Sequence, residues 1–415
     1  MDETSSSDEF DQLDGHGSPL PSRTFGQVRG FDGLRGIAVL TIFIAHLDVI
    51  LPLSTFLVIP GAMISLDSFF VLSGFLITAL LLREQGRRGS IGIGPFYRRR
   101  VLRLLPALCV VVLALAIYAH ATHQWQHSET PSILSVLFYY SNYFLASARG
   151  PFSPQVAPGF QHFWSLSFEE QFYFVWPWIT IILLTVRMRL RTVAIVLLTL
   201  ITIIAVHRLI LYNDTGRWWS ILYRTDTRAD SILWGALLAH IWIRHKEPKR
   251  GIRVAGWVAA AFLAGSLVFS TEYGPFLFRG GFVAVDAACA VLLLAIIDGK
   301  WAGRHLFEWK PFVALGIVSY GFYLWHLPVF FGIRYFDPHW NDVVRVVVAV
   351  SLTLALTLLS WFLLEKPMMN WSKGLERKRN DNRGAVSPVH QRADHLPAST
   401  TSAVAMDATG VDTNS

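Results

Sequence analysis

Charged residues are scarce in this chain. Only 16% of its 415 residues are Asp, Glu, Lys or Arg, whereas 53% are hydrophobic, and the mean hydropathy is +0.42. Soluble globular chains carry about 25% charged residues, so this shortage excludes an ordinary soluble domain and makes lipid the solvent for most of the chain. The sequence therefore predicts an all-α polytopic protein of the cell (plasma or inner) membrane.

Cysteine is almost absent as well. The two cysteines, Cys109 and Cys289, each lie in an apolar run, and neither has a second cysteine at C-x-x-C spacing. This excludes a disulfide framework and a thiolate metal site, and both side chains are expected to pack as small hydrophobes. We expect no metal ion and no bound cofactor.

A basic segment followed by an apolar one, the pattern of a secretory signal peptide, is missing at the N-terminus. The first residues are instead rich in serine and acidic side chains, which favours a disordered cytoplasmic tail over 1–28. The last part of the chain is polar and aperiodic, so 369–415 is expected to be a basic and then disordered cytoplasmic tail. The membrane domain is predicted between them, over 29–368.

Ten apolar runs, most of them roughly 20 residues long, are expected to cross the bilayer as helices. A further run at 132–146 is too short to span, so it is expected to lie at the interface or to re-enter the bundle. No internal repeat strong enough to suggest an inverted-repeat transporter is visible. The ten expected spans are 36–55, 62–82, 101–119, 164–186, 192–212, 229–243, 254–270, 279–298, 311–333 and 343–364.

The net charge of +7 is not spread evenly over the chain. Lysines and arginines cluster beside apolar runs, which indicates contact with membrane lipids and no nucleic-acid partner. Loops rich in these residues alternate with poor ones, and the asymmetry predicts that both termini are cytoplasmic. The loop at 207–228 is an exception, because it contains Arg208, Arg217, Arg224 and Arg228.

Two ionisable residues of the first span, Arg35 and His46, are eleven residues apart. On an ideal helix this spacing puts them on one face, separated by about 16 Å along the axis. Arginine suits a phosphate at the cytoplasmic mouth, and a neutral imidazole near the middle of the span suits a general base. The structural alternative is an arginine that snorkels to the interface and a histidine that a neighbouring helix satisfies.

An arginine cluster lies at the inner end of the third span: Arg98, Arg99, Arg100 and Arg103. The last three can share one helix face. They either anchor the protein on anionic lipid or cradle a polyphosphorylated cytoplasmic donor. In the preceding span, a small residue such as Ser73 more often allows helices to approach closely than it acts as a nucleophile.

Carboxylates occur where an apolar environment should not tolerate them. The segment WSLSFEEQFYFVWP is expected to put Glu169 at the outer end of its span, where a carboxylate must pair or bind. An interfacial aromatic belt explains the tryptophans of this segment but not the glutamates. Downstream, Asp226, Arg228 and Asp230 can pair with one another inside the protein.

A second histidine lies in the segment LGIVSYGFYLWHLPVF. Ser319, Tyr323 and His326 follow one another at steps of four and three residues, so they form one stripe of one helix. Pro328 is expected to kink this span just beyond the histidine.

In their order and spacing these motifs resemble the acyltransferase 3 family of membrane acyltransferases, over roughly residues 29–368. Some relatives carry an extracytoplasmic hydrolase-like domain after the membrane part, whereas we expect the stand-alone form here. The matching elements are Arg35 with His46, FFVLSGFLI at 69–77, RRRVLRLLP at 98–106, WSLSFEEQFYFVWP at 164–177, the Arg/Asp patch at 224–235, SYGFYLWHLP at 319–328 and EKP at 365–367.

The resemblance implies transfer of an acyl group, often acetyl, from cytoplasmic acyl-CoA to a hydroxyl of a glycan, glycolipid or similar envelope acceptor. It implies that His46 is the catalytic histidine and Arg35 its partner, and we add Glu169 as a third catalytic candidate. An acyl-histidine intermediate and the identity of the oxyanion donor stay open. The residues expected to bind substrates are Arg98, Arg99, Arg100, Arg103, Ser73, Tyr323 and His326.

Two other classes of protein compete with this interpretation. A transporter or flippase of a glycan or lipid would also need polar groups in a cavity, but it would be favoured by an internal repeat with paired broken helices. A lipid-surface sensor would account for the basic loops and would leave His46 and Glu169 unexplained.

Overall fold

The computed structural model of the protein describes residues 28–52, 59–122, 127–244, 251–271, 273–336 and 339–385, and every regular element within these ranges is helical. The longer helices are α2 (Arg29–Ala45), α3 (Ile64–Arg88), α4 (Ile93–Ala121), α7 (Phe163–Thr185), α8 (Leu190–Thr215), α11 (Asp230–Arg244), α12 (Gly251–Phe269), α13 (Phe282–Asp298), α16 (Ser319–Phe336), α17 (Asp342–Ser360) and α18 (Lys366–Ala385). The all-α prediction is confirmed.

Short helices connect or extend these elements. The apolar run at 132–146, which was expected not to span, falls in two of them, α5 and α6, of 9 and 7 residues. The short elements are η2 (His46–Val49), α5 (Glu129–Leu137), α6 (Ser141–Ser147), α9 (Trp218–Leu222), α10 (Thr225–Arg228), η3 (Leu277–Gly281), α14 (Arg304–Phe307), α15 (Lys310–Ile317) and η4 (Trp361–Glu365).

A helix, or a pair of consecutive helices, lies at each of the ten predicted spans. Seven helices of the described residues are long and apolar enough to cross a membrane, and the pair α15–α16, bent by 77°, brings the number to eight. The chain is thus a multi-pass membrane protein. The helices at the other two predicted spans, α7 and α11, do not meet this criterion of length and hydropathy. The count of ten spans therefore stays a prediction, and so does the cytoplasmic location of the termini.

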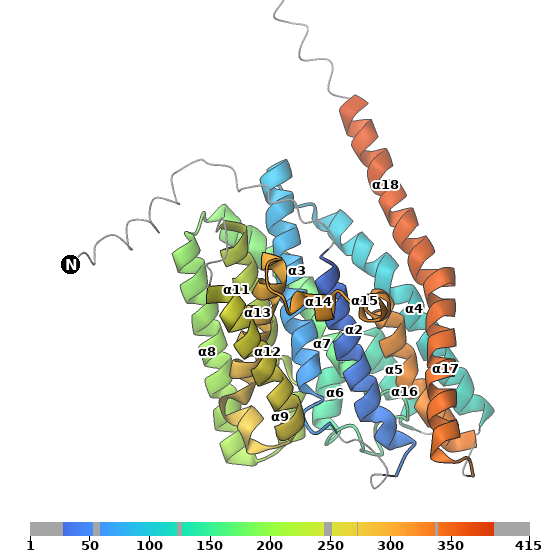
Figure 1. The fold of residues 1–415 in the computed structure, drawn as a ribbon. Helices are drawn as coiled ribbons and strands as arrows, with labels where there is room; N and C mark the ends of the chain where they lie inside the picture. The colour runs from blue at the N-terminus through green and yellow to red at the C-terminus, as the bar shows by residue number, and fades with distance from the viewer. Residues whose placement is uncertain are drawn as a thin grey trace, which may run out of the picture. The chain divides into compact units, whose positions relative to one another are not determined.

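The long helices of residues 28–369 stand side by side, with α8 and α17 at opposite edges and α2 and α3 between them (Figure 1). In the most apolar 18-residue stretch of α3, 78% of the residues are buried inside the protein, whereas the values for α8, α12 and α17 are 22%, 17% and 22%. The inner helices therefore bury their apolar side chains against protein, and the outer ones leave theirs for lipid.

Helices α3 and α11 touch through their backbones. A Cβ atom added to Gly235 of α11 would lie 1.9 Å from the carbonyl oxygen of Val71, and one added to Gly74 of α3 would lie 2.0 Å from that of Ile232. The role expected for small residues in this span, close helix approach, is confirmed here for glycine.

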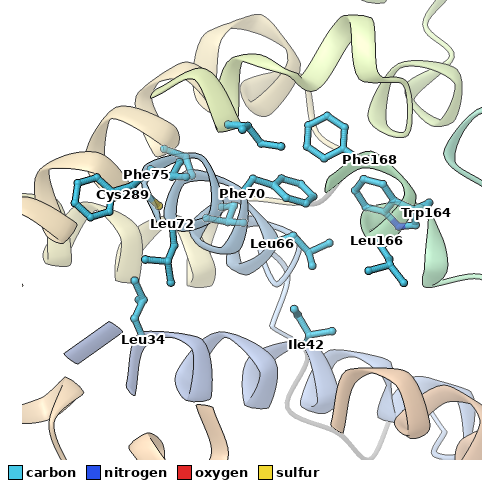
Figure 2. Packing of buried hydrophobic residues seen from close by; sticks show 14 of the residues in the cluster. Leu34, Ile42, Leu66, Phe70, Leu72, Phe75, Trp164, Leu166, Phe168 and Cys289 are labelled. Carbon is cyan, nitrogen blue, oxygen red and sulfur yellow. The ribbon is translucent and has the colours of Figure 1, made fainter. Parts of the chain in front are cut away.

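Aromatic rings join α3 to α7 (Figure 2). The ring centroid of Phe70 lies 4.5 Å from that of Phe168 and 6.1 Å from that of Trp164, both in edge-to-face geometry, and all three side chains are buried. Such pairs hold ring orientation as well as burying area. Because Glu169 directly follows Phe168, this packing places the first turns of α7 against the interior of the bundle.

Candidate active site

Three cavities lie next to one another inside the bundle, and we name them outer, middle and inner after the predicted orientation of the chain, which stays a prediction. The outer cavity, about 110 Å³, is lined by His46 and Tyr323 among others. The middle cavity, about 70 Å³, shares Tyr323 with it and adds Arg35 and Glu169. The inner cavity, about 90 Å³, shares Arg35 and Glu169 and adds Arg100. Shared lining residues thus place the three cavities next to one another, from the arginine-rich end of the bundle to His46.

A chain of hydrogen bonds fixes the state of His46. Its Nδ1 lies 3.1 Å from Nε2 of His326, and Nδ1 of His326 lies 2.6 Å from the backbone oxygen of Tyr323. A carbonyl oxygen only accepts, so Nδ1 of His326 carries its proton and Nε2 of His326 is the acceptor. The proton of His46 is therefore on Nδ1, and its Nε2 is left with a free lone pair, as a general base requires.

His46 lies just beyond the end of its helix. Helix α2 ends at Ala45, and His46 is the first residue of the 3₁₀ turn η2. The helix therefore ends earlier than its apolar run, and the depth of His46 in the bilayer stays a prediction. Arg35 and His46 nevertheless line parts of the same connected path, through the middle and outer cavities.

His162 belongs to the same cluster and was missed by the sequence analysis. Its buried ring has its centroid 5.1 Å from that of His326 and lines the outer cavity. Its backbone oxygen accepts a hydrogen bond of 2.7 Å from the hydroxyl of Tyr323, which is 2.7 Å from Oγ of Ser165. The available signal was a histidine directly before an aromatic motif.

The three histidines do not form a metal centre. Within the part of the chain that the structure describes, no group of three His, Cys, Asp or Glu side chains could hold a metal ion. The pairing of His46 with His326 uses Nδ1 of His46 and both ring nitrogens of His326, for each other and for a carbonyl group.

Glu169 collects hydrogen bonds between the middle and inner cavities. Oγ of Ser73 donates to Oε1 at 3.0 Å, and the hydroxyl of Tyr173 lies 3.4 Å from Oε2. Glu169 is the seventh residue of α7, about 9 Å along the helix from its first residue, and it lines the inner cavity with Arg35 and Arg100. Hydrogen bonds and the nearby arginines favour its charged form there, whereas burial opposes it. Its place at the outer end of a span stays a prediction.

The arginine cluster divides in two. Arg100 and Arg103 line the inner cavity, and the guanidinium of Arg100 lies 3.5 Å from the ring centroid of Tyr173. Arg99 instead forms an ion pair of 3.8 Å with Glu84 of α3. The predicted common face is wrong for Arg99, because the carboxylate at the end of α3 holds it away from the cavity.

Arg98 lies outside the three cavities and is partly buried. Two of its guanidinium nitrogens have no hydrogen-bond partner among the described residues. The stripe expected on α16 does form: Ser319 and Tyr323 line the middle cavity, and His326 reaches His46. Helix α16 continues through Pro328, and the 77° bend lies before Ser319 rather than at the proline.

A second polar cluster lies between α3, α8, α11 and α13. Arg228 pairs with Asp67, and Arg208 pairs with Asp230 at 2.7 Å. The hydroxyl of Ser231 lies between two carboxyls, 3.1 Å from Asp67 and 3.0 Å from Asp286. We call these residues the ion cluster; all six are buried and none lines the three cavities.

Internal pairing also accounts for the loop that departs from the charge asymmetry. Besides Arg208 and Arg228, Arg224 is paired, at 2.6 Å from Asp226. Burial alone would raise the pKa of Asp226, but hydrogen bonds from Arg224 and His207 hold that pKa below its ordinary value. Internal ion pairing of this segment is confirmed, but Asp226, Arg228 and Asp230 do not pair with one another. Their partners are Arg224, Asp67 and Arg208.

The fold and this site together describe a multi-pass membrane protein with a row of polar groups in its interior. The row runs from Arg100 and Arg103 at one end to the hydrogen-bonded pair of His46 and His326 at the other. The acyltransferase 3 family, described as an acyltransferase domain, matches residues 28–365. Since the match covers most of the chain, the protein belongs to this family, as the resemblance of its motifs implied.

Several relatives are similar over most of this chain. YrhL of Bacillus subtilis (strain 168) is 31% identical over 82% of this chain and 55% of its own length. Peptidoglycan O-acetyltransferase OatA of Listeria monocytogenes is 30% identical over 85% of this chain and 58% of its own. O-acetyltransferase OatA of Staphylococcus aureus (strain NCTC 8325 / PS 47) is 28% identical over 82% and 57%. The chain spans little more than half the length of these relatives. No solved structure matches it significantly.

Proposed function

We propose that this protein is an integral membrane O-acyltransferase. It moves an acyl group, acetyl by analogy with the named relatives, from acyl-CoA at the arginine-rich end to a hydroxyl of a cell-wall glycan at the outer cavity. The observation that carries the proposal is the hydrogen-bond chain from Tyr323 through His326 to His46, which leaves Nε2 of His46 unprotonated in a cavity.

The chemistry needs a base because a sugar hydroxyl is a weak nucleophile near neutral pH. Nε2 of His46 takes the hydroxyl proton as the oxygen attacks the thioester carbonyl. The C–S bond breaks, the acyl group stays on the sugar oxygen, and the proton passes from His46 to the departing thiolate. His326 stabilises the imidazolium by accepting from Nδ1 throughout.

The donor is assigned to the inner cavity by charge. Coenzyme A is a polyanion, and Arg100 and Arg103 present guanidinium groups that match phosphate oxygens. The middle cavity, at about 70 Å³, is far below the roughly 300–1,000 Å³ of ordinary ligand sites. This favours passage of a narrow thioester arm over passage of a whole glycan, as a flippase would need.

Substitution of His46 tests the proposal. His46→Ala and His46→Gln should both lose about 10²–10⁴-fold in transfer from radiolabelled acetyl-CoA, because glutamine keeps a hydrogen bond but takes no proton near neutral pH. Activity is measured in membranes and normalised to folded protein. A His46→Gln variant within a few-fold of wild type would remove His46 from the mechanism and return it to a packing role.

A further inference from the structure

The rim of the outer cavity carries groups that the transfer chemistry does not use. Phe152 lies in the connection between α6 and α7, outside the candidate membrane spans, and is 79% exposed. Tyr273 lies across the same cavity and is 41% exposed. Its ring packs on Trp218 with centroids 3.9 Å apart, so it is held in place. Rings at a bilayer interface usually face lipid, whereas these line the cavity that contains His46.

Gln161 supplies a second, independent observation. Its Oε1 is buried, has no hydrogen-bond partner among the described residues, and belongs to a side chain that lines the outer cavity. A buried acceptor without a donor costs about 1–3 kcal/mol. A ligand hydroxyl can donate or accept, so it would satisfy the Gln161 amide in either orientation. Asp48, exposed on the same lining, offers a further acceptor.

We propose that Phe152, Tyr273 and Gln161 form the acceptor subsite and that its ligand is a sugar ring. A pyranose has C–H faces that pack against the electron-rich faces of aromatic rings, and hydroxyls at its edge that reach an amide or a carboxylate. A lipid alcohol would match the rings, but its single hydroxyl cannot serve both His46 and Gln161, whereas a sugar ring carries several hydroxyls. The assignment rests on the proposed function, because only a bound sugar hydroxyl beside His46 gives the subsite a use in acyl transfer.

Direct binding without an acyl donor tests the subsite. The probe is a β-1,4-linked N-acetylglucosamine tetrasaccharide, added to the full chain in lipid nanodiscs and followed by tryptophan fluorescence, since Trp164 lines the same cavity. Phe152→Ala and Gln161→Leu should each weaken binding by about tenfold, the equivalent of one lost ring contact or hydrogen bond. Phe152→Trp should restore it.

Phe269→Ala is the matched control, because Phe269 is an 86% exposed ring at the end of α12 that does not line the cavity. It should bind the tetrasaccharide as wild type does. Equal binding by Phe152→Ala, Gln161→Leu and wild type would overturn the subsite, and so would equal weakening in Phe269→Ala. A fluorescence response to dodecanol, with no response to the tetrasaccharide, would assign the rim to lipid and would also overturn the subsite.

Failure of the subsite can be told apart from failure of the proposed function. In transfer assays, the rim variants should raise KM for the glycan about tenfold and leave KM for acetyl-CoA unchanged. If His46→Gln stays active, the base is wrong, whatever the binding data show. If His46→Gln is inactive but the rim variants keep wild-type acceptor KM, the subsite alone is wrong.

Discussion

The protein has two polar clusters in an apolar bundle, and they accommodate ionisable side chains in an apolar interior in opposite ways. The ion cluster balances carboxylates against guanidiniums, and none of its residues lines the three cavities. The histidine cluster is neutral, links His46 to His326, and leaves a lone pair facing a cavity. Ionisable residues inside a membrane are costly in either case. The comparison shows what distinguishes a candidate catalytic residue from a structural ion pair. It is a polar atom without a hydrogen-bond partner that lines a cavity, and not the rarity of the residue type in an apolar sequence.

Removal of a charge from the ion cluster should have the largest effect. Arg228→Leu strands the Asp67 carboxylate in an interior with little water, and loss of one partner of a buried pair costs about 3–5 kcal/mol. We expect a large fall in the melting temperature of detergent-purified protein, with activity per folded molecule unchanged. A stable Arg228→Leu variant that has lost turnover would instead give the ion cluster a catalytic role.

His326 should come next, through chemistry rather than stability. His326→Ala removes the acceptor that holds Nδ1 of His46 protonated, and we expect a fall in kcat of about 10²-fold with KM for acetyl-CoA unchanged. His326→Gln, whose Oε1 can accept the same hydrogen bond, should recover part of kcat. Full activity in His326→Ala would show that His46 needs no positioning residue.

Arg100 lines the inner cavity, whereas Arg99 pairs with Glu84. This difference predicts a smaller effect, on the affinity for the acyl donor. Arg100→Ala should raise KM for acetyl-CoA about tenfold, the value of one charge-assisted hydrogen bond of about 1.5 kcal/mol. Arg99→Ala is the matched control from the next position, and its pair with Glu84 is expected to contribute under 1 kcal/mol to stability. Equal KM shifts in the two variants would mean that both arginines act only through anionic lipid.

The smallest effect is expected at Asp286, inside the ion cluster itself. Ser231 has one hydroxyl hydrogen but contacts both Asp67 and Asp286. If that hydrogen goes to Asp67, which pairs with Arg228, Asp286 must supply the second one and is protonated. Asp286→Asn, a donor of the same shape, should change the free energy of unfolding by under about 0.5 kcal/mol. A loss as large as that of Arg228→Leu would show that Asp286 carries charge.

The sequence predicts the helices well because each long apolar run leaves the backbone no alternative in lipid. It also finds most of the residues on the path, because arginine, histidine and glutamate are conspicuous among apolar neighbours. It fails where partners come from distant segments. Arg99 is held by Glu84, and His162 joins the cluster only after α7 packs against α16. Local spacing carries no information about such contacts.

The narrow middle cavity has an electrical consequence. Three arginines and two glutamates line the middle and inner cavities: Arg35, Arg100, Arg103, Glu169 and Glu170. A fixed excess of positive charge raises the barrier to cations, as an arginine does in water channels. A neutral thioester arm can enter such a path while sodium ions and hydronium are repelled. Under the function proposed above, this charge would let acyl groups cross the bilayer without dissipating the ion gradients across it.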